Sequence, residues 1–335
     1  MPGSASGSVR SLREAVRDGA RILADAGVAS AEFDAVALAA FAGNTTAGEV
    51  RKRMVIGAPV PQGFDELVSE RARRVPLQHL TGKAGFRRLE LSVGPGVFIP
   101  RFETELTAAL AIAFLLAALD KPRDGAPESG VNLGTLHRTV PRFVGLGSAG
   151  SLGLSGDAGA ASVGPAVVVD LCSGSGAIAL AIKDEVPSAE VHGVELSELA
   201  HAWAIRNRDD LGLDVDLRLG DATQAFPDLA AAADVVVSNP PYIPTGSIPN
   251  DPEVRDHDPE VALYGGSADG LRIPVAVAAR AGFLLRPGGF FVMEHADAQG
   301  DSLPRALSAA GCWDDITDHT DLNGRPRAVS AVRAN

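Results

Sequence analysis

The fold is decided by one stretch of the sequence, Ala166-Val167-Val168-Val169-Asp170-Leu171-Cys172-Ser173-Gly174-Ser175-Gly176. Residues 166–171 are almost entirely apolar, which is typical of a strand buried in the middle of a parallel sheet. Two glycines follow, and glycine lets a turn between a strand and a helix bring its backbone close to a ligand. The stretch therefore predicts a strand, a ligand-binding turn and a helix that begins at Ala177.

The alternation of strand and helix continues after this stretch. It predicts strands over 190–196, 215–219, 234–238 and 289–294, and helices over 177–185, 199–211 and 273–285. Strands that alternate with helices along the chain indicate a doubly wound, Rossmann-like α/β sheet. Ligands bind such sheets at the carboxyl ends of the strands.

The chain before residue 106 has a different character. Apolar residues recur at helical spacing over 9–75, which predicts a helical bundle. This pattern comprises Leu12, Ala15, Val16, Ile22, Leu23, Phe33, Val36, Ala37, Ala40 and Phe41, with Ser30 as the cap of the second helix. Short apolar runs with glycine and proline over 84–99 predict a β-hairpin. We expect a helical domain over 1–83, a linker over 84–105 and an α/β domain over 106–335, with a Gly/Ser/Pro-rich insertion at about 120–164.

Composition limits the classes of protein that fit. Hydrophobic residues make up 46% of the 335 residues, so the chain can bury a core and does not have the composition of a disordered protein. There are only two cysteines, which is typical of a reducing cytoplasm. The longest apolar run, residues 106–119, is shorter than the roughly 20 residues of a membrane-spanning helix, and the polar N-terminus lacks a secretory signal. We expect a cytoplasmic protein without a membrane segment.

Charge is unevenly distributed along the chain. Residues 1–90 hold 13 Lys+Arg and 10 Asp+Glu, whereas residues 91–335 hold 17 and 32, so the net charges are +3 and −15. Non-specific attraction to nucleic acid normally needs a basic surface. The acidic part of the chain therefore argues against a duplex DNA substrate, and we expect no direct contact with nucleic acid.

Acidic residues and the glycine turn form the predicted cofactor site. Asp170 precedes the turn and can pair with a charged amino group. Glu195 ends the next strand and can accept both hydroxyls of a ribose, and Asp221 ends the following strand, where it can contact an adenine. The predicted set is Asp170, Cys172, Ser173, Gly174, Ser175, Gly176, Glu195, Asp221, Ala222 and Asn239. We expect Cys172 to be a small turn residue without a reactive thiol.

The spacing Gly174-x-Gly176-x-x-Ala179 also matches a dinucleotide-binding fingerprint, which is a weak signal alone. Asp170 favours S-adenosylmethionine, because a carboxylate suits an amino group better than a pyrophosphate, and nothing later in the sequence resembles a nicotinamide site. We therefore expect S-adenosylmethionine as cofactor and S-adenosylhomocysteine as product. We expect no metal, because the seven histidines are scattered.

The most specific element is Asn239-Pro240-Pro241-Tyr242, which directly follows the strand over 234–238. The prolines fix φ and stiffen the loop. The Asn239 side-chain carbonyl and the Pro240 backbone carbonyl can then accept hydrogen bonds from one NH₂ group, while Tyr242 stacks on or walls off its planar group. Positioning and polarising a planar amide or amine nitrogen in this way predicts a methyltransferase in which Asn239, Pro240 and Tyr242 are catalytic.

With these motifs, the sequence resembles the HemK-type (PrmC) family of protein-glutamine N-methyltransferases, which modify peptide chain release factors. The resemblance covers nearly the whole chain except about 120–164. It rests on residues 76–82, 96–105, 170–176, 239–242, 251–255, 263–266, 269–271 and 286–289.

The resemblance implies that the substrate is the glutamine of a Gly-Gly-Gln loop in the release factors, held by a monomeric enzyme whose helical domain helps to bind that protein. The implied substrate-binding residues are Asn239, Pro240, Pro241, Tyr242, Phe98, Arg101 and Glu103. For the last three a structural role stays open, with Phe98 in the core and Arg101 paired with Glu103. The sequence departs from the family at Phe102, where proline is preferred, at Glu195, where aspartate is commoner, and at Cys172, where glycine is usual.

Other functions also stay open at this point. An adenine-N6 DNA methyltransferase uses the same loop on an exocyclic amine, although it must flip a base and hold phosphate. A methyltransferase of a ribosomal-protein glutamine shares every motif. From other classes, a nicotinamide-dependent oxidoreductase or a non-catalytic nucleotide-binding scaffold would need only the glycine turn.

Overall fold

The computed structural model describes residues 10–119 and 164–335. The chain forms two compact units. Unit 1 comprises residues up to Lys83 together with 93–95 and 249–257, and unit 2 comprises 84–92, 96–248 and 258–335. Residues 120–163, which hold almost all of the expected insertion, lie outside the described residues.

Unit 1 is a helical bundle, as the spacing of apolar residues predicts. Its helices are α1 (Leu12–Asp25), α2 (Ala31–Ala42), α3 (Ala47–Val55), α4 (Phe64–Ala72), α5 (Leu77–Thr81) and α9 (Pro252–His257). Ser11 begins α1 with a capping box, in which its side chain accepts from the Glu14 backbone and the Glu14 carboxylate accepts from the Ser11 backbone. Leu12 and Leu23 of α1 are buried in the bundle core, whereas Ile22 is 46% exposed.

Some of the apolar residues at helical spacing in α2 lie outside its buried face. Phe33 and Phe41 are 62% and 48% exposed, while the helix buries Leu38 and several alanines. This helix is apolar on nearly every side, so spacing alone could not identify the face that packs. Ser30 does not cap the helix with its side chain, because its hydroxyl donates to Asp34 Oδ1 at 2.8 Å.

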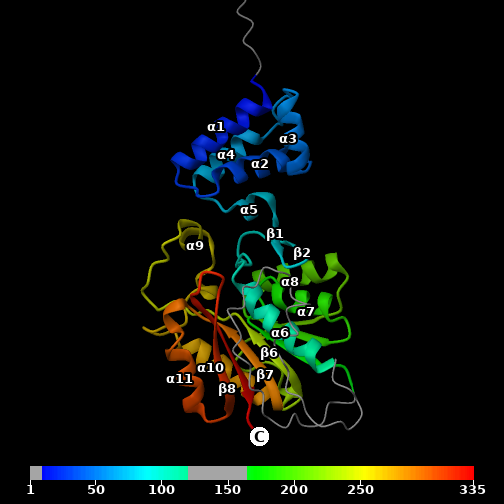
Figure 1. Ribbon diagram of the computed structural model, residues 1–335, viewed down its shortest axis with the longest axis vertical. Coiled ribbons are helices and arrows are strands. Elements are labelled where there is room, and N and C mark those ends of the chain that lie inside the picture. Colours follow the sequence, from blue (N-terminus) through cyan, green and yellow to red (C-terminus); the bar gives the residue numbers. More distant parts are fainter. Residues whose placement is uncertain (1–9, 120–163) are drawn as a thin grey trace, which may run out of the picture. The chain divides into compact units, whose positions relative to one another are not determined.

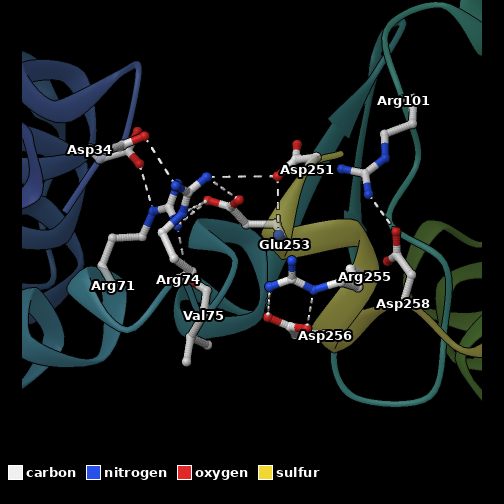
Figure 2. A network of polar contacts seen from close by, with 11 residues as sticks. Asp34, Arg71, Arg74, Val75, Arg101, Asp251, Glu253, Arg255, Asp256 and Asp258 are labelled. Atoms are coloured by element: carbon white, nitrogen blue, oxygen red, sulfur yellow. Dashed lines mark hydrogen bonds and ion pairs between the residues drawn. The ribbon is translucent and has the colours of Figure 1, made fainter. Parts of the chain in front are cut away.

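A buried ionic network joins α9 to the rest of unit 1, as Figure 2 shows. Arg71 donates to Asp34 at 2.8 Å and to Glu253 at 2.7 Å, and Arg74 donates through Nε to Glu253 at 2.8 Å. Burial alone would raise the pKa of Glu253, but its hydrogen bonds, led by those from Arg74, lower that pKa well below its usual range. Glu253 is thus ionised and tied to two arginines.

Unit 2 contains the predicted hairpin and a seven-stranded sheet. The hairpin is β1 (Lys83–Phe86) and β2 (Leu89–Ser92). The sheet strands are β3 (Val167–Leu171), β4 (Glu190–Glu195), β5 (Asp216–Leu219), β6 (Ala233–Ser238), β7 (Leu285–Glu294), β8 (Trp313–Thr320) and β9 (Pro326–Arg333). Their order is β5-β4-β3-β6-β7-β9-β8, with β9 antiparallel to both of its neighbours and the other pairs parallel. The sequence prediction ends at residue 294 and misses β8 and β9. The polar, acidic β8 lacks the apolar alternation of a typical strand.

Helices cover both faces of the sheet, which confirms the doubly wound fold (Figure 1). The helices are α6 (Thr104–Leu119), α7 (Ala177–Glu185), α8 (Glu198–Leu211), α10 (Arg272–Leu284) and α11 (Ser302–Ala310). Side chains of successive strand residues point to opposite faces. Val168 accordingly packs in the core with α6 and α7, and Val169 packs in the core with α10 and α11.

Candidate active site

The register of the sheet gathers the ends of four strands at one edge. Leu171 pairs with Val194 and with Ser238, and Ser238 pairs with Met293. The strand order switches sides at β3, because β4 and β5 lie on one side of it and β6 and β7 on the other. Ligands bind at such a switch point in doubly wound folds. The groups that come next at this edge are the glycine turn after β3, Glu195 of β4, Asn239 after β6 and Glu294 of β7.

The glycine turn has the left-handed backbone that its sequence predicts. Gly174 and Gly176 have φ values of +57° and +82°, and Gly176 is the N-cap of α7. Apart from Gly174 and its two chain neighbours, no described residue has an atom within 4 Å of the position that a Cβ of Gly174 would occupy, so the backbone there can be approached closely. Cys172 is also left-handed, with φ of +66°. Burial raises the pKa of its thiol, with a further contribution from Glu195, which agrees with an unreactive turn residue.

Asp170 is fully buried at the end of β3, and half of its carboxyl group has no partner. Oδ2 accepts from the Ala179 backbone N–H at 3.1 Å, whereas Oδ1 has no hydrogen-bond partner among the described residues. Burial raises the pKa of Asp170 well above its usual range. A buried, unpartnered oxygen at this position fits a cationic group of a ligand, such as the amino group of S-adenosylmethionine.

Glu195 is held by hydrogen bonds from both sides. Oε2 accepts from the Gly174 N–H and Oε1 from the Ser197 N–H, each at 2.8 Å. Carboxylate oxygens retain further lone pairs after one bond each, so a fixed carboxylate can still accept two ribose hydroxyls. The next residue, Leu196, is 57% exposed and offers apolar surface beside it. This arrangement suits the nucleoside part of the predicted cofactor.

Asp221 lies next to the end of β4, because the Gly220 N–H donates to the Glu195 carbonyl at 2.8 Å. Asp221 Oδ1 accepts from both the backbone and the hydroxyl of Thr223, each at 2.8 Å, and so closes a turn. Ala222 is 8% exposed. The adenine contact expected of Asp221 would therefore use its other oxygen.

The loop Asn239–Tyr242 leaves β6 with both polar side chains anchored. Asn239 Nδ2 donates to the Thr104 hydroxyl at 3.1 Å, and the Tyr242 hydroxyl donates to Glu294 Oε1 at 3.0 Å. The Tyr242 carbonyl accepts from Gln299 Nε2 at 3.0 Å. The loop is thus fixed by three separate parts of unit 2 as well as by its prolines.

Glu294 is 2% exposed and lies at the centre of these contacts. Burial raises its pKa, while interactions with the Thr104 and Tyr242 hydroxyls and with Arg327 act in the opposite direction. Glu294 Oε2 is buried and has no hydrogen-bond partner among the described residues. Burial, followed by the charge of Glu294, also raises the pKa of the Tyr242 hydroxyl, which therefore remains protonated at neutral pH.

The three residues placed by resemblance have distinct surroundings. Phe98 is half-buried, and the Arg101 guanidinium lies 5.1 Å from the centre of its ring. Arg101 pairs with Asp258 at 2.5 Å (Figure 2), and this partner differs from Glu103, the partner in the structural alternative. Glu103 is exposed, and its negative charge contributes to the raised pKa of Tyr242 and of Glu294.

Sequence reasoning missed Thr104, Glu294 and Asp258. Thr104 stands inside the quoted motif 96–105, and Glu294 is an acidic residue at the end of an apolar strand, the same signal that identified Glu195. Asp258 follows the motif 251–255, and no local pattern marks it.

The described residues hold neither a cluster of metal ligands nor a membrane-spanning helix. They contain no cluster of three or more His, Cys, Asp or Glu arranged to hold a metal ion. None of their helices combines the length and the apolar character needed to cross a membrane.

Comparison with known proteins agrees with this geometry. Residues 14–82 match the PrmC N-terminal domain, and residues 162–249 match the methyltransferase small domain. The chain is 44% identical to a release factor glutamine methyltransferase of Streptomyces coelicolor, over 93% of this chain and 94% of that one. A protein of the same name from Mycolicibacterium smegmatis is 39% identical, over 96% and 98%.

A relative with a different name is also similar. The 4-amino-L-phenylalanine/4-methylamino-L-phenylalanine methyltransferase of Streptomyces pristinaespiralis is 35% identical, over 94% of this chain and 90% of that one. All three are methyltransferases, and two share the same name at near full length. The chain is thus an S-adenosylmethionine-dependent methyltransferase that belongs to the release factor glutamine methyltransferase family.

Proposed function

We propose that this enzyme methylates the side-chain amide nitrogen of the glutamine in the Gly-Gly-Gln motif of peptide chain release factors, and that it acts as a monomer in the cytoplasm. The observation that supports this most is the placing of Asn239–Tyr242 at the same sheet edge as the glycine turn and Glu195. The names of the relatives support the choice of release factors.

The chemistry follows from what the residues hold in place. Bound S-adenosylmethionine supplies an electrophilic methyl group on a sulfonium. Asp170, the glycine turn and Glu195 would hold it, and Asn239 Oδ1 with the Pro240 carbonyl would accept both protons of the substrate NH₂. An amide nitrogen is a poor nucleophile, so the loop contributes by positioning it and by polarising it through these two bonds. Transfer would form the N–CH₃ bond as the S–CH₃ bond of the sulfonium breaks, which leaves S-adenosylhomocysteine as a neutral thioether. The nitrogen would release one proton to solvent, and no residue would form a covalent intermediate.

The alternatives have weaker support. The net charge of −15 over residues 91–335 disfavours a DNA adenine substrate. Acceptors such as an aromatic amine, as in the name of the Streptomyces pristinaespiralis relative, or a ribosomal-protein glutamine offer the same NH₂ group to the loop. They are the relevant competitors.

The test compares acceptors with the wild-type enzyme and the Asn239→Ala variant. We expect transfer to a release factor but not to duplex DNA or to 4-aminophenylalanine. We expect Asn239→Ala to lower kcat by about 10²–10³, as for loss of one preorganised hydrogen-bonding group in other active sites. Calorimetry should show cofactor binding within a few-fold of wild type. Equal loss of cofactor binding and turnover would contradict the assigned role of Asn239.

A further inference from the structure

One contact of Asn239 is not explained by the loop motif. Its Nδ2 donates to Thr104 Oγ1 at 3.1 Å, and Thr104 lies 135 residues earlier, at the start of α6. The Thr104 side chain is 4% exposed, so water does not replace it easily. Because folding must bring these residues together, the contact restricts Asn239 in a way that the local sequence does not.

The restriction concerns the direction of the Asn239 amide group. Rotation of a terminal amide exchanges its acceptor oxygen and its donor nitrogen, and the two orientations have similar intrinsic energies. A substrate NH₂ group is a donor and must meet Oδ1. If Nδ2 faced the substrate, two donors would oppose each other. Since Thr104 takes up Nδ2, Oδ1 is the atom left for the substrate.

A threonine hydroxyl can also donate, and donation to Oδ1 would stabilise the wrong orientation. The structure has the other arrangement, in which the Thr104 hydroxyl accepts from Nδ2. Glu294 Oε2 is buried with no hydrogen-bond partner among the described residues, and it is the acceptor toward which the hydroxyl proton would point. A carboxyl group accepts through an oxygen whether or not it is ionised. The same group accepts from the Tyr242 hydroxyl at 3.0 Å.

We propose that Thr104 is a positioning residue: with its proton directed to Glu294, it holds Asn239 so that Oδ1 faces the NH₂ group of the acceptor. This inference rests on the proposed function, since it takes an NH₂ group as the acceptor. Glu294 then orients both Asn239, through Thr104, and Tyr242 directly.

Three variants of α6 test the proposal. Thr104→Val keeps the size of the side chain and removes its hydroxyl, and we expect kcat toward a release factor to fall roughly tenfold, as for one hydrogen bond. The KM for S-adenosylmethionine should not change. Thr104→Ser should restore kcat. The control is Thr107→Val on the same helix, because the Thr107 hydroxyl is buried with no hydrogen-bond partner among the described residues. Full kcat in Thr104→Val would overturn the proposal.

A double-mutant cycle separates positioning from general loss of structure. In the Asn239→Ala background, Thr104→Val should have no further effect on kcat, because its role passes through Asn239. If the fold-losses of kcat from the two single variants instead multiplied in the double variant, Thr104 would act independently of Asn239, and the proposal would be rejected.

A second readout needs no acceptor. The chain has seven asparagines, so ¹⁵N-asparagine labelling gives few side-chain NH₂ signals, and Asn239→Ala identifies the relevant pair. The chemical shifts of this pair should be the same in wild type and Thr104→Ser. In Thr104→Val they should move toward the shifts of a free amide. If the Asn239 signals were unchanged in Thr104→Val, the proposal for Thr104 would be rejected, whatever the enzyme methylates. If the wild-type enzyme methylated no release factor, only the proposed function would be rejected.

Discussion

At the scale of single residues, the two carboxyl groups beside the glycine turn differ in how far the protein satisfies them. Both oxygens of Glu195 accept backbone hydrogen bonds, whereas Asp170 leaves Oδ1 buried and without a described partner. A buried carboxylate without a partner disfavours the folded state. A ligand cation beside Oδ1 would stabilise the ionised form of Asp170 at this position.

Asp170→Asn tests this directly. Burial raises the folded-state pKa of Asp170 above its usual 3.8. The contribution of Asp170 to the free energy of unfolding is therefore most favourable below pH 3.8, where the group is protonated, and this contribution is lost as pH rises toward the raised pKa. Asparagine removes this loss and can still accept from Ala179. We expect the variant without cofactor to be at least as heat-stable as wild type at pH 7, and cofactor-induced stabilisation to fall sharply. A clearly less stable variant with normal cofactor binding would contradict the assignment.

At the scale of elements, the segment after the catalytic loop is held by very close backbone contacts. The Gly265 N–H donates to the Ile243 carbonyl at 2.9 Å, just beyond Tyr242. A Cβ added at Gly265 would lie 1.9 Å from the Gly270 carbonyl oxygen, which is backbone and cannot rotate away. The Leu263–Gly266 motif thus has a packing reason for its glycine.

We expect Gly265→Ala to cost more than about 3 kcal/mol of stability, at the upper end for overpacking, and to lower kcat as well. The matched control is Gly85→Ala, because no described residue beyond its chain neighbours has an atom within 4 Å of the Cβ position at Gly85. Chemical denaturation of both variants is the measurement. Equal stability of the two would show that the backbone around Gly265 can yield.

The ionic network of α9 gives a second prediction at this scale. Glu253→Gln removes a buried negative charge from Arg71 and Arg74, and we expect the free energy of unfolding to fall by about 3 kcal/mol. The control is Asp256→Asn, which breaks an exposed pair with Arg255 and should leave the free energy of unfolding nearly unchanged (Figure 2). Because the pKa of Glu253 is lowered, its stabilisation exists above its usual pKa of 4.5 and disappears as pH falls through the lowered value. A difference between wild type and Glu253→Gln that persisted at strongly acid pH would contradict this reading.

At the scale of the whole molecule, the sequence was most informative where local pattern and function coincide. The apolar strand, the glycine turn and the Asn239–Tyr242 loop could be predicted because each needs particular residues at fixed spacing. The edge strand β8, the buried face of α2 and the partners Thr104 and Asp258 could not. They depend on contacts between distant segments, and such contacts leave no periodic signal in one sequence.

The most direct test of the proposed activity is mass spectrometry of a purified release factor after incubation with the enzyme and S-adenosylmethionine. We expect a gain of one methyl group in place of a hydrogen on the glutamine of the Gly-Gly-Gln peptide, and no gain with Asn239→Ala. An unmodified glutamine in the presence of a folded, cofactor-binding enzyme would contradict the proposed substrate. Methylation at another residue of the peptide would contradict the role assigned to the loop.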